Sequence, residues 1–223
     1  MFIILVGAGR TGRRVLELAT QQGHEVVVIE QDHERAQTAS EEFDCIAIND
    51  DGASQQALIE ADIEDADALI ATTDDDATNV LVMMHGRDFE VPSLVSSVND
   101  DANARLYRQL SVNTVESPHR LNGEYLYRAV QRPSIQDFME VGQAAEIFEI
   151  TVDQQAEIAG LTLDEAGRKG LFDDETIVVA IQRGGDVHIP RGQTRIEAGD
   201  LVTVFSVDGA TEATTRPFKK HDL

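Results

Sequence analysis

Six residues near the start of the chain have the types and spacing of a phosphate-binding turn. Gly7-Ala8-Gly9-Arg10-Thr11-Gly12 is a G-x-G-x-x-G sequence between the apolar run FIILV (2–6) and an amphipathic stretch. The first glycine permits a tight turn, the second lets the backbone approach a pyrophosphate, and the third lets helix and strand pack closely. The N-terminus of the following helix would offer unpaired N–H groups and partial positive charge to phosphates.

An acidic residue stands where such a turn needs a partner for the ribose. Glu30 ends the second apolar run, EVVVIE (25–30), eighteen residues after Gly12. An acid at this point accepts a hydrogen bond from a ribose 2′-hydroxyl and repels the 2′-phosphate of NADP. The pattern therefore predicts binding of NAD or another adenosine ribose, and a purely structural glycine turn is the alternative.

The rest of the first half supplies the elements that would hold this turn. Short apolar runs alternate with amphipathic stretches, which predicts strands at 2–6, 25–30, 44–48, 67–72, 91–98 and 112–115 and helices at 10–22, 32–42, 53–61, 75–87 and 100–110. Continuous apolar strands separated by helices indicate a parallel sheet covered on both faces. We expect an α/β fold, with a Rossmann-type doubly wound parallel sheet in residues 1–117.

The pattern changes after this sheet. Residues 118–140 are expected to be a helical linker or dimerisation segment, with one helix at 119–131 and, after Pro133, a second helical stretch up to about Glu140. This segment would expose apolar side chains, which predicts association into at least a dimer; they include Leu121, Leu126 and Val130.

The last part is expected to be a smaller α+β domain at 141–223. Its strands are predicted at 145–152, 175–182, 186–190 and 200–205, and the residues from Thr214 to Leu223 are predicted to be a frayed tail. Arg183 and Arg191 would either meet phosphates in this domain or offset surface acids, and the second interpretation is favoured. Whether this domain dimerises, binds a second ligand or does both stays open.

The charge composition of the chain argues against some classes of binding partner. The chain has 41 acidic and 18 basic residues, a net charge of −23, and only three lysines. Such a surface repels phosphate backbones, which argues against general nucleic-acid binding and against docking on an anionic membrane. A halophilic source is favoured over a cation-rich partner as the cause of this excess. No apolar run reaches the ~18 residues of a membrane span, and a secretory leader is not expected.

Residues for bond-making chemistry are not evident. His85 and His119 lie outside any recognisable catalytic pattern, whereas a dehydrogenase needs a proton relay beside the nicotinamide. Cys45, the single cysteine, excludes an intramolecular disulfide and is expected in the core. Asp74-Asp75-Asp76 would cap the next helix or bind a cation, and capping is favoured. We therefore expect no catalytic residue and no metal site.

Several further blocks follow the glycine turn and Glu30 in order. They are Asn49-Asp50-Asp51-Gly52-Ala53, then Ala61, Ile63 and Ala66 to Thr73, then Asp76, Asn79 and Val98-Asn99-Asp100. Together they resemble the regulator of potassium conductance N-terminal domain, the TrkA-N family. The second half is similar to the companion TrkA-C domain through Ile158 to Leu163, Val178 to Gly185, Ile189-Pro190 and Glu197 to Asp200.

The resemblance implies a nucleotide site made by Gly7, Ala8, Gly9, Arg10, Thr11, Gly12, Glu30, Gln31, Asp50, Asp51, Thr72, Thr73 and Ser97. The turn and Arg10 would hold phosphates, Glu30 the ribose, and Asp50 or Asp51 would lie near the adenine. Many members read Ala-Arg-Val-Asn after the fifth strand, whereas this chain reads Ser96-Ser97-Val98-Asn99. The missing arginine favours NAD(H), ADP or AMP over ATP.

The resemblance also implies a function without catalytic turnover. The chain would be a cytosolic regulatory subunit of a potassium uptake system. It would lie at the inner face of the membrane, as a dimer or a ring of four or eight copies beneath a TrkH- or KtrB-like channel, and nucleotide binding would gate ion flow. The alternatives are a regulatory subunit of another cation transporter and a small NAD-dependent oxidoreductase.

Overall fold

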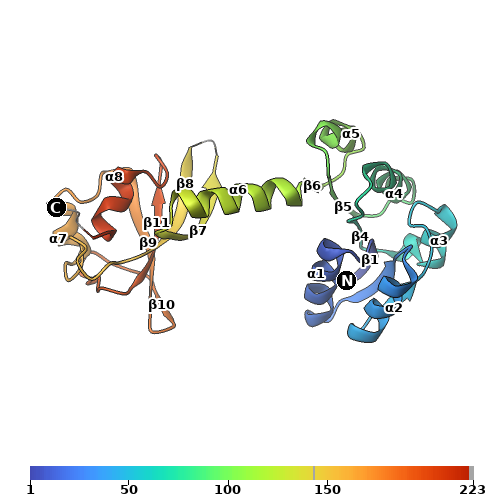
Figure 1. Cartoon of the computed structure of the whole chain (residues 1–223), viewed down its shortest axis with the longest axis horizontal. Helices are drawn as coiled ribbons and strands as arrows, with labels where there is room; N and C mark the ends of the chain where they lie inside the picture. Colours follow the sequence, from blue (N-terminus) through green and yellow to red (C-terminus); the bar gives the residue numbers. More distant parts are fainter. Residues whose placement is uncertain (143, 221–223) are drawn as a thin grey trace. The chain divides into compact units, whose positions relative to one another are not determined.

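The computed structural model describes residues 1–142 and 144–220 of the chain. These residues divide into an N-terminal unit, residues 1–123, and a C-terminal unit that begins at Glu124, each built around its own core (Figure 1). Within the described residues, no helix combines the length and the apolar character that crossing a bilayer requires.

Six parallel strands form the sheet of the N-terminal unit, in the order β3-β2-β1-β4-β5-β6. They are β1 (Phe2–Val6), β2 (Glu25–Ile29), β3 (Ile46–Ile48), β4 (Ala68–Ala71), β5 (Ser93–Ser97) and β6 (Thr114–Glu116). The chain runs outward from β1 to β3 and then crosses to β4 on the other side of β1, so the strand order reverses between β1 and β4. Ligands of doubly wound sheets bind at the carboxyl ends of the strands at such a point.

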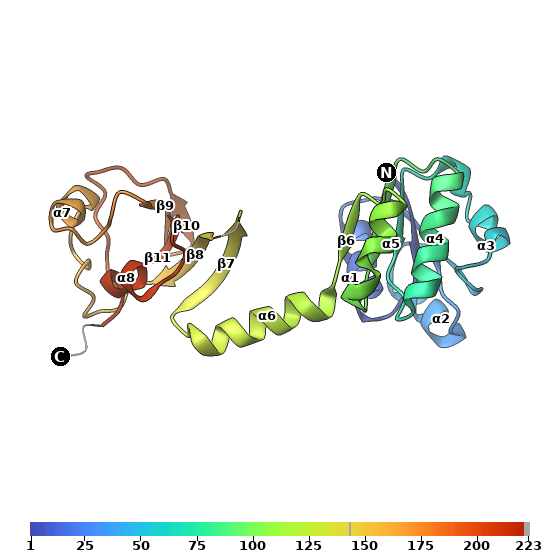
Figure 2. The same cartoon turned by 90° about the horizontal axis from the view of Figure 1, so that it is seen from above.

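Helices cover both faces of this sheet, as predicted (Figure 2). They are α1 (Arg10–Gln21), α2 (His33–Glu42), α3 (Gln55–Glu60), η1 (Ile63–Asp65), α4 (Asp76–Asp88), η2 (Asp101–Asn103) and α5 (Ala104–Gln109). Leu16 of α1 packs with Leu5 on one face, whereas Leu58 of α3 and Met83 of α4 pack with Ile4 on the other. Neighbouring residues of β1 therefore enter opposite cores, which is why the strand is apolar throughout.

The segment after the sheet is only partly helical. Helix α6 (Pro118–Gln131) is confirmed, but the second helical stretch predicted up to Glu140 is wrong, because Ile135–Val141 forms strand β7. A bulge at Gln136 shifts the pairing of β7 with β8, so Ile135 and Phe138 both face the C-terminal core. Their three-residue spacing therefore imitates a helical period within a strand.

An antiparallel sheet forms the C-terminal unit, in the order β10-β9-β11-β8-β7. Its other strands are β8 (Ala145–Thr151), β9 (Thr176–Arg183), β10 (Asp186–His188) and β11 (Leu201–Ser206), and its helices are α7 (Leu163–Arg168), α8 (Glu212–Thr215) and η3 (Arg216–Phe218). Alternate residues of β8 and β11, such as Phe148 and Val202, enter one core, whereas their neighbours lie on the other face.

The predicted tail is ordered structure as far as the structure describes it. Thr215 is 1% exposed and Phe218 is fully buried against Phe172, with ring centroids 5.7 Å apart. The N–H of Asp153 donates to the carbonyl oxygen of Phe218 at 2.9 Å. The prediction of a frayed segment from Thr214 is therefore wrong up to Lys220, because Phe218 anchors the chain; residues 221–223 lie outside the described residues.

Candidate functional site

The carboxyl ends of the parallel strands bring the predicted residues to one edge of the sheet. Gly7 follows β1, Glu30 follows β2, Asp50 comes shortly after β3, Thr72 follows β4 and Ser97 ends β5. Backbone hydrogen bonds join neighbouring strands there: the N–H of Gly7 donates to Ile29, and that of Thr72 donates to Val6. Residues far apart in the sequence therefore share this edge.

The three glycines of the turn have different structural reasons to be glycine. Gly7 has φ +96°, and a Cβ there would lie 3.1 Å from the Thr73 nitrogen. A Cβ on Gly12 would overlap the carbonyl oxygen of Gly7 and lie 2.7 Å from the Thr72 hydroxyl. A Cβ on Gly9 would meet no heavy atom within 4 Å among the residues described. The fold thus requires glycine at positions 7 and 12, whereas the space beside Gly9 is open.

Helix α1 begins at this open space without a side-chain cap. Gly9 is its N-cap residue and has extended backbone angles. By contrast, Asp32 caps α2 and Asp75 caps α4, each by accepting a backbone N–H. The first N–H groups of a helix have no intrahelical acceptor, so the start of α1 can bind an anion. Arg10 and Thr11 are exposed beside it.

The Glu30 carboxylate closes the other side of the turn. Glu30 is 7% exposed, and its two oxygens accept hydrogen bonds from the backbone N–H groups of Ala8 at 2.6 Å and Asp32 at 2.9 Å. Both donor residues also line a pocket of about 390 Å³ between α1 and α2. The carboxylate is therefore fixed between the glycine turn and the end of β2.

The loop after β3 lies next to Glu30. The side-chain amide of Asn49 donates to the carbonyl oxygens of Glu30 and Gln31, each at 2.9 Å. Gln31, Asp50 and Asp51 are exposed beside this contact. The acidic end of the site suits neutral hydroxyl and amino donors, whereas the open start of α1 suits phosphate.

The predicted hydroxyl residues are bonded to the walls of the site. Thr72 donates to the carbonyl oxygen of Gly7 at 3.0 Å, and Thr73 donates to the Asn79 side-chain oxygen at 2.7 Å. Ser97 is 7% exposed and donates to the carbonyl oxygen of Ala71 at 3.4 Å. Thr72 thus bonds the turn itself, whereas Thr73 and Ser97 bond residues of α4 and β4.

Asn79 has a role that the sequence interpretation missed. It is fully buried on α4, and its amide donates to the carbonyl oxygens of Thr73 at 3.1 Å and Ser97 at 3.4 Å, joining the ends of β4 and β5. An asparagine at an inward position of an amphipathic helix is the signal that would have revealed it, because a buried amide needs partners.

Asp76 is a second such residue. Its carboxylate accepts backbone N–H groups from Asn99 at 2.7 Å and Asp100 at 2.9 Å and the side-chain amide of Asn103 at 2.8 Å. Burial raises the pKa of Asp76, but these hydrogen bonds outweigh it and hold the pKa below its usual value. Asp75 caps α4, as predicted for this acidic run. The described residues contain no group of His, Cys, Asp and Glu that would hold a metal ion.

His85 and His119 lie away from this edge of the sheet, whereas His33, at the start of α2, has its ring Nδ1 3.3 Å from the Asn49 side-chain oxygen beside Glu30. His85 is in the last turn of α4, whereas the site meets the first turn of that helix, and His119 is on α6. Cys45 is half-buried against the α1–α2 core, and burial raises the pKa of its thiol. His85, His119 and Cys45 thus lie apart from the glycine turn and Glu30.

Comparisons with known proteins show to which family the chain belongs. The family model of the TrkA-N domain matches residues 3–118, and that of the TrkA-C domain matches residues 147–219. A "Trk system potassium uptake protein TrkA homolog" of Methanothermobacter thermautotrophicus is 28% identical, over 98% of this chain and 99% of that protein. "Trk system potassium uptake protein TrkA" of Mycobacterium tuberculosis is 28% identical, over 97% of each chain.

Solved structures share the fold. The "GsuK channel bound to NAD" has a TM-score of 0.69 at 16% identity, over 99% of this chain, which spans 40% of that chain. The "Shewanella denitrificans Kef CTD in AMP bound form" has a TM-score of 0.52 at 19% identity, over 59% of this chain and 80% of that one. Since the TrkA-N model alone covers more than half of the residues, this chain belongs to the TrkA-N domain family and carries a TrkA-C domain after it.

Proposed function

We propose that this chain is a nucleotide-sensing regulatory subunit that gates potassium uptake through a separate membrane protein. The observation that carries the proposal is the uncapped start of α1 beside the buried Glu30 carboxylate. One end attracts phosphate and the other accepts ribose hydroxyls. The names of the relatives, potassium uptake proteins of the TrkA type, support the regulatory role.

The proposed ligand is NAD(H), ADP or AMP. Solved proteins of the same fold carry NAD, ADP or AMP in their names, which supports an adenine nucleotide here. A serine at position 97 supplies no charge for a third phosphate, so ATP is expected to bind more weakly. The proposed contacts are those predicted from the sequence: Gly7, Ala8, Gly9, Arg10, Thr11, Gly12, Glu30, Gln31, Asp50, Asp51, Thr72, Thr73 and Ser97.

The nucleotide acts as a signal and is not consumed. A ligand that binds two conformations unequally shifts the balance between them. A tenfold difference in affinity supplies only ~1.4 kcal/mol per site, so a sharp switch needs several coupled copies.

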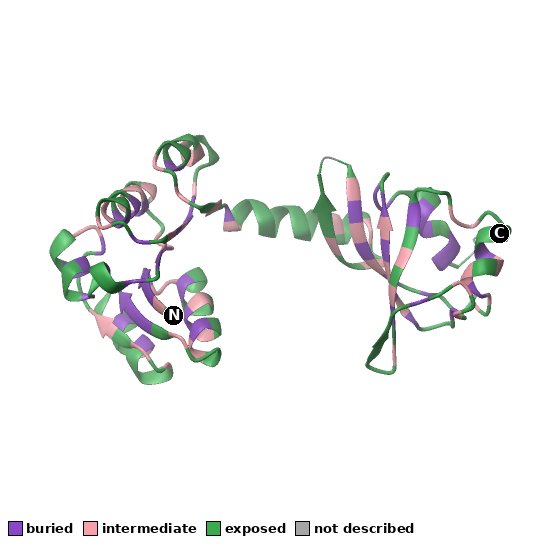
Figure 3. Ribbon diagram, turned by 180° about the vertical axis from the view of Figure 1, so that it is seen from behind, coloured by how far each residue is buried: buried purple, intermediate pink, exposed green. Residues whose placement is uncertain are grey.

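Helix α6 offers a surface for such assembly. None of its residues is buried, and Leu121, Leu126 and Val130 are 46%, 66% and 81% exposed (Figure 3). Covering these side chains would remove apolar surface from water. We infer that copies associate through α6 into a dimer or a larger ring on the cytoplasmic side of a TrkH- or KtrB-like partner. A monomer by light scattering in concentrated KCl would contradict this.

A regulatory subunit of another cation transporter is the second candidate. The fold likeness to the Kef CTD favours it, because that domain shares the N-terminal architecture. Copurification of the tagged chain with its membrane partner separates the two candidates: a potassium channel subunit supports the first, and an antiporter supports the second.

Isothermal titration calorimetry with NADH, NAD, ADP, AMP and ATP tests nucleotide sensing. We expect micromolar binding of at least one nucleotide, with NADH recovered unchanged. Gly9→Asp places a charge in the open space beside the turn and should abolish binding. Gly167→Asp is the matched control, because Gly167 is exposed on α7 and also has open space around it. Full affinity in Gly9→Asp, or oxidation of NADH by a carbonyl compound, would refute the proposal.

A further inference from the structure

The C-terminal unit contains a pocket of about 800 Å³ whose charge is opposite to that of the chain. It lies between the end of α6, the start of β7 and the segment of α8 and η3. Four basic side chains and one acidic side chain line it, although the chain as a whole carries a net charge of −23. Two of the three lysines of the chain, Lys219 and Lys220, are here.

Most of these cations are not neutralised by a described neighbour. Arg132 donates to the Glu146 carboxylate at 2.8 Å, and Glu146 also accepts the N–H of Ala210 at 2.7 Å. Arg132 is thereby held at the wall by a buried acid. Within residues 1–142 and 144–220, no ion pair is made by Arg216, Lys219 or Lys220.

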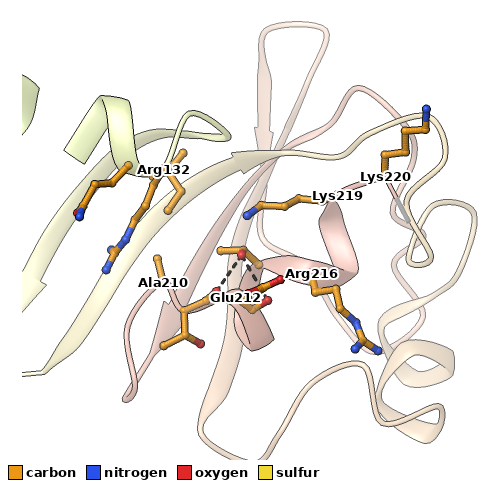
Figure 4. Close-up of a pocket in the computed structure, with 10 residues that line it drawn as sticks. Arg132, Ala210, Glu212, Arg216, Lys219 and Lys220 are labelled. Atoms are coloured by element: carbon orange, nitrogen blue, oxygen red, sulfur yellow. Dashed lines mark hydrogen bonds between the residues drawn. The ribbon is translucent and has the colours of Figure 1, made fainter. Parts of the chain in front are cut away.

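The backbone that carries the cations is fixed. The N–H of Ile158 donates to the carbonyl oxygen of Pro217 at 3.2 Å, Phe218 is fully buried, and Lys220 forms a β-bridge with Ala156. Figure 4 shows the Lys219 side chain extending toward Arg132, whereas the side chains of Arg216 and Lys220 extend outward on the opposite side of the pocket. The backbone positions of these cations are therefore set by the fold.

We propose that this pocket binds a small phosphate-bearing anion, at a site separate from the glycine turn. Guanidinium and ammonium groups are the side chains that hold phosphate oxygens. A volume of about 800 Å³ lies in the range of sites for nucleotide-sized ligands. Several cations across one pocket favour a ligand with more than one negative charge over a single carboxylate.

The pocket adjoins the end of helix α6, so a ligand bound there would affect the association of copies. Gln131 is the last residue of α6, and Arg132 follows it directly. An anion here contacts the end of the helix through which we infer that copies associate. An anion bound in this pocket would therefore be a second regulatory ligand, in addition to the nucleotide at the glycine turn.

Calorimetric titration of the full chain with inorganic tripolyphosphate tests this inference, because this probe has no base or ribose. We expect saturable binding that the double variant Arg216→Gln/Lys219→Gln weakens at least tenfold. Lys169→Gln removes the remaining lysine, which is exposed on the C-terminal side of α7, and should leave the affinity unchanged. Unchanged unfolding temperatures establish that both variants fold.

A variant at the glycine turn separates this pocket from the proposed nucleotide site. Gly9→Asp blocks the glycine turn and should leave the pocket's tripolyphosphate affinity intact, whether or not nucleotide sensing holds. If Gly9→Asp abolishes the binding and the double variant does not, the probe binds at the turn and the inference is wrong. The inference is also wrong if the wild-type chain does not bind tripolyphosphate. It is likewise wrong if the double variant changes the number of associated copies but leaves the tripolyphosphate affinity unchanged.

Discussion

Arg183 binds Asp200 through two parallel hydrogen bonds, with Nε 2.7 Å from one carboxylate oxygen and Nη2 2.8 Å from the other. Asp200 is 1% exposed, and its carboxylate also accepts the backbone N–H of Glu197 at 2.8 Å. The second guanidinium edge reaches the Glu197 carboxylate at 2.8 Å. This network joins the end of β9 to the turn before β11, and it agrees with the interpretation of Arg183 as a residue that offsets acids.

Loss of this arginine should destabilise the C-terminal unit. Arg183→Gln leaves the Asp200 carboxylate buried without its charged partner, so we expect the free energy of unfolding to fall by about 2 kcal/mol. Arg191→Gln is the control, because Arg191 is exposed and its replacement should change the free energy by less than about 0.5 kcal/mol. Urea unfolding measures both values, and equal losses would contradict the assigned role of Arg183.

The same pair predicts a pH dependence. Burial raises the pKa of Asp200, but hydrogen bonds from Arg183 and Glu197 outweigh it, so the pKa lies below its usual value. A lowered carboxyl pKa stabilises the folded chain above the unfolded pKa of about 3.9, and this contribution disappears as the pH falls through the folded pKa. The difference in unfolding free energy between wild type and Arg183→Gln should therefore shrink below about pH 4. Urea titrations at a series of pH values test this, and a constant difference would contradict it.

Substitutions at two glycines of the turn should have different effects on stability and on nucleotide binding. Gly12→Ala forces the new methyl group against the Gly7 carbonyl, which should cost about 1–3 kcal/mol of unfolding free energy. Gly9→Asp adds an N-cap carboxylate to α1 and should raise the free energy by a few tenths of a kcal/mol, while nucleotide binding is lost. Thermal unfolding and calorimetry on the same samples provide both readouts. A loss of stability in Gly9→Asp would show that its space is not open.

Glu30 should determine discrimination between NADH and NADPH. Its carboxylate repels the 2′-phosphate, so wild type should prefer NADH, and Glu30→Gln should reduce the ratio of the two affinities by about tenfold. Because Glu30 also holds the N–H of Ala8, the ratio is a better test than NADH affinity alone. Glu25→Gln, at the other end of the same strand, is the control. If Glu30→Gln leaves the ratio of NADH to NADPH affinity unchanged, Glu30 does not contact the ribose.

The excess of acidic residues predicts stabilisation by salt. Repulsion within a net charge of −23 acts over ~30 Å at 0.01 M salt but only ~3 Å at 1 M. The unfolding temperature should therefore rise steeply with KCl concentration, and an equally concentrated sucrose solution should raise it much less. Equal effects of the two solutes would argue against repulsion as the cause.

The parallel sheet could be predicted because its strands are buried on both faces. Val26 to Ile29 are all nearly inaccessible, and an unbroken apolar run of this length between helical stretches is typical of a strand inside a parallel sheet. The glycine turn and Glu30 could be predicted for a similar reason, because their spacing reflects local backbone geometry. The contact between the turn and Glu30 involves only residues close to the ends of β1 and β2.

Other features depend on contacts that no local pattern contains. Ile135 and Phe138 have helical spacing, and only the bulge opposite β8 makes that spacing compatible with a strand. Phe218 fixes the last described segment through Phe172, far earlier in the chain. The roles of Asn79 and Asp76 likewise depend on partners from the next strand and loop. Each of these differences arises from partners that are distant in the sequence.

The open space beside Gly9 has a consequence for comparing relatives. The architecture demands glycine at positions 7 and 12 whether or not a ligand binds, so those two residues carry no information about the ligand. Position 9 is under no such demand, so under the proposed function it is the bound phosphate that excludes a side chain there. A relative that keeps the outer two glycines but has a larger residue at the middle position should be an assembled yet unresponsive subunit. Under the proposed function, the residue at the middle position would therefore distinguish responsive from unresponsive copies.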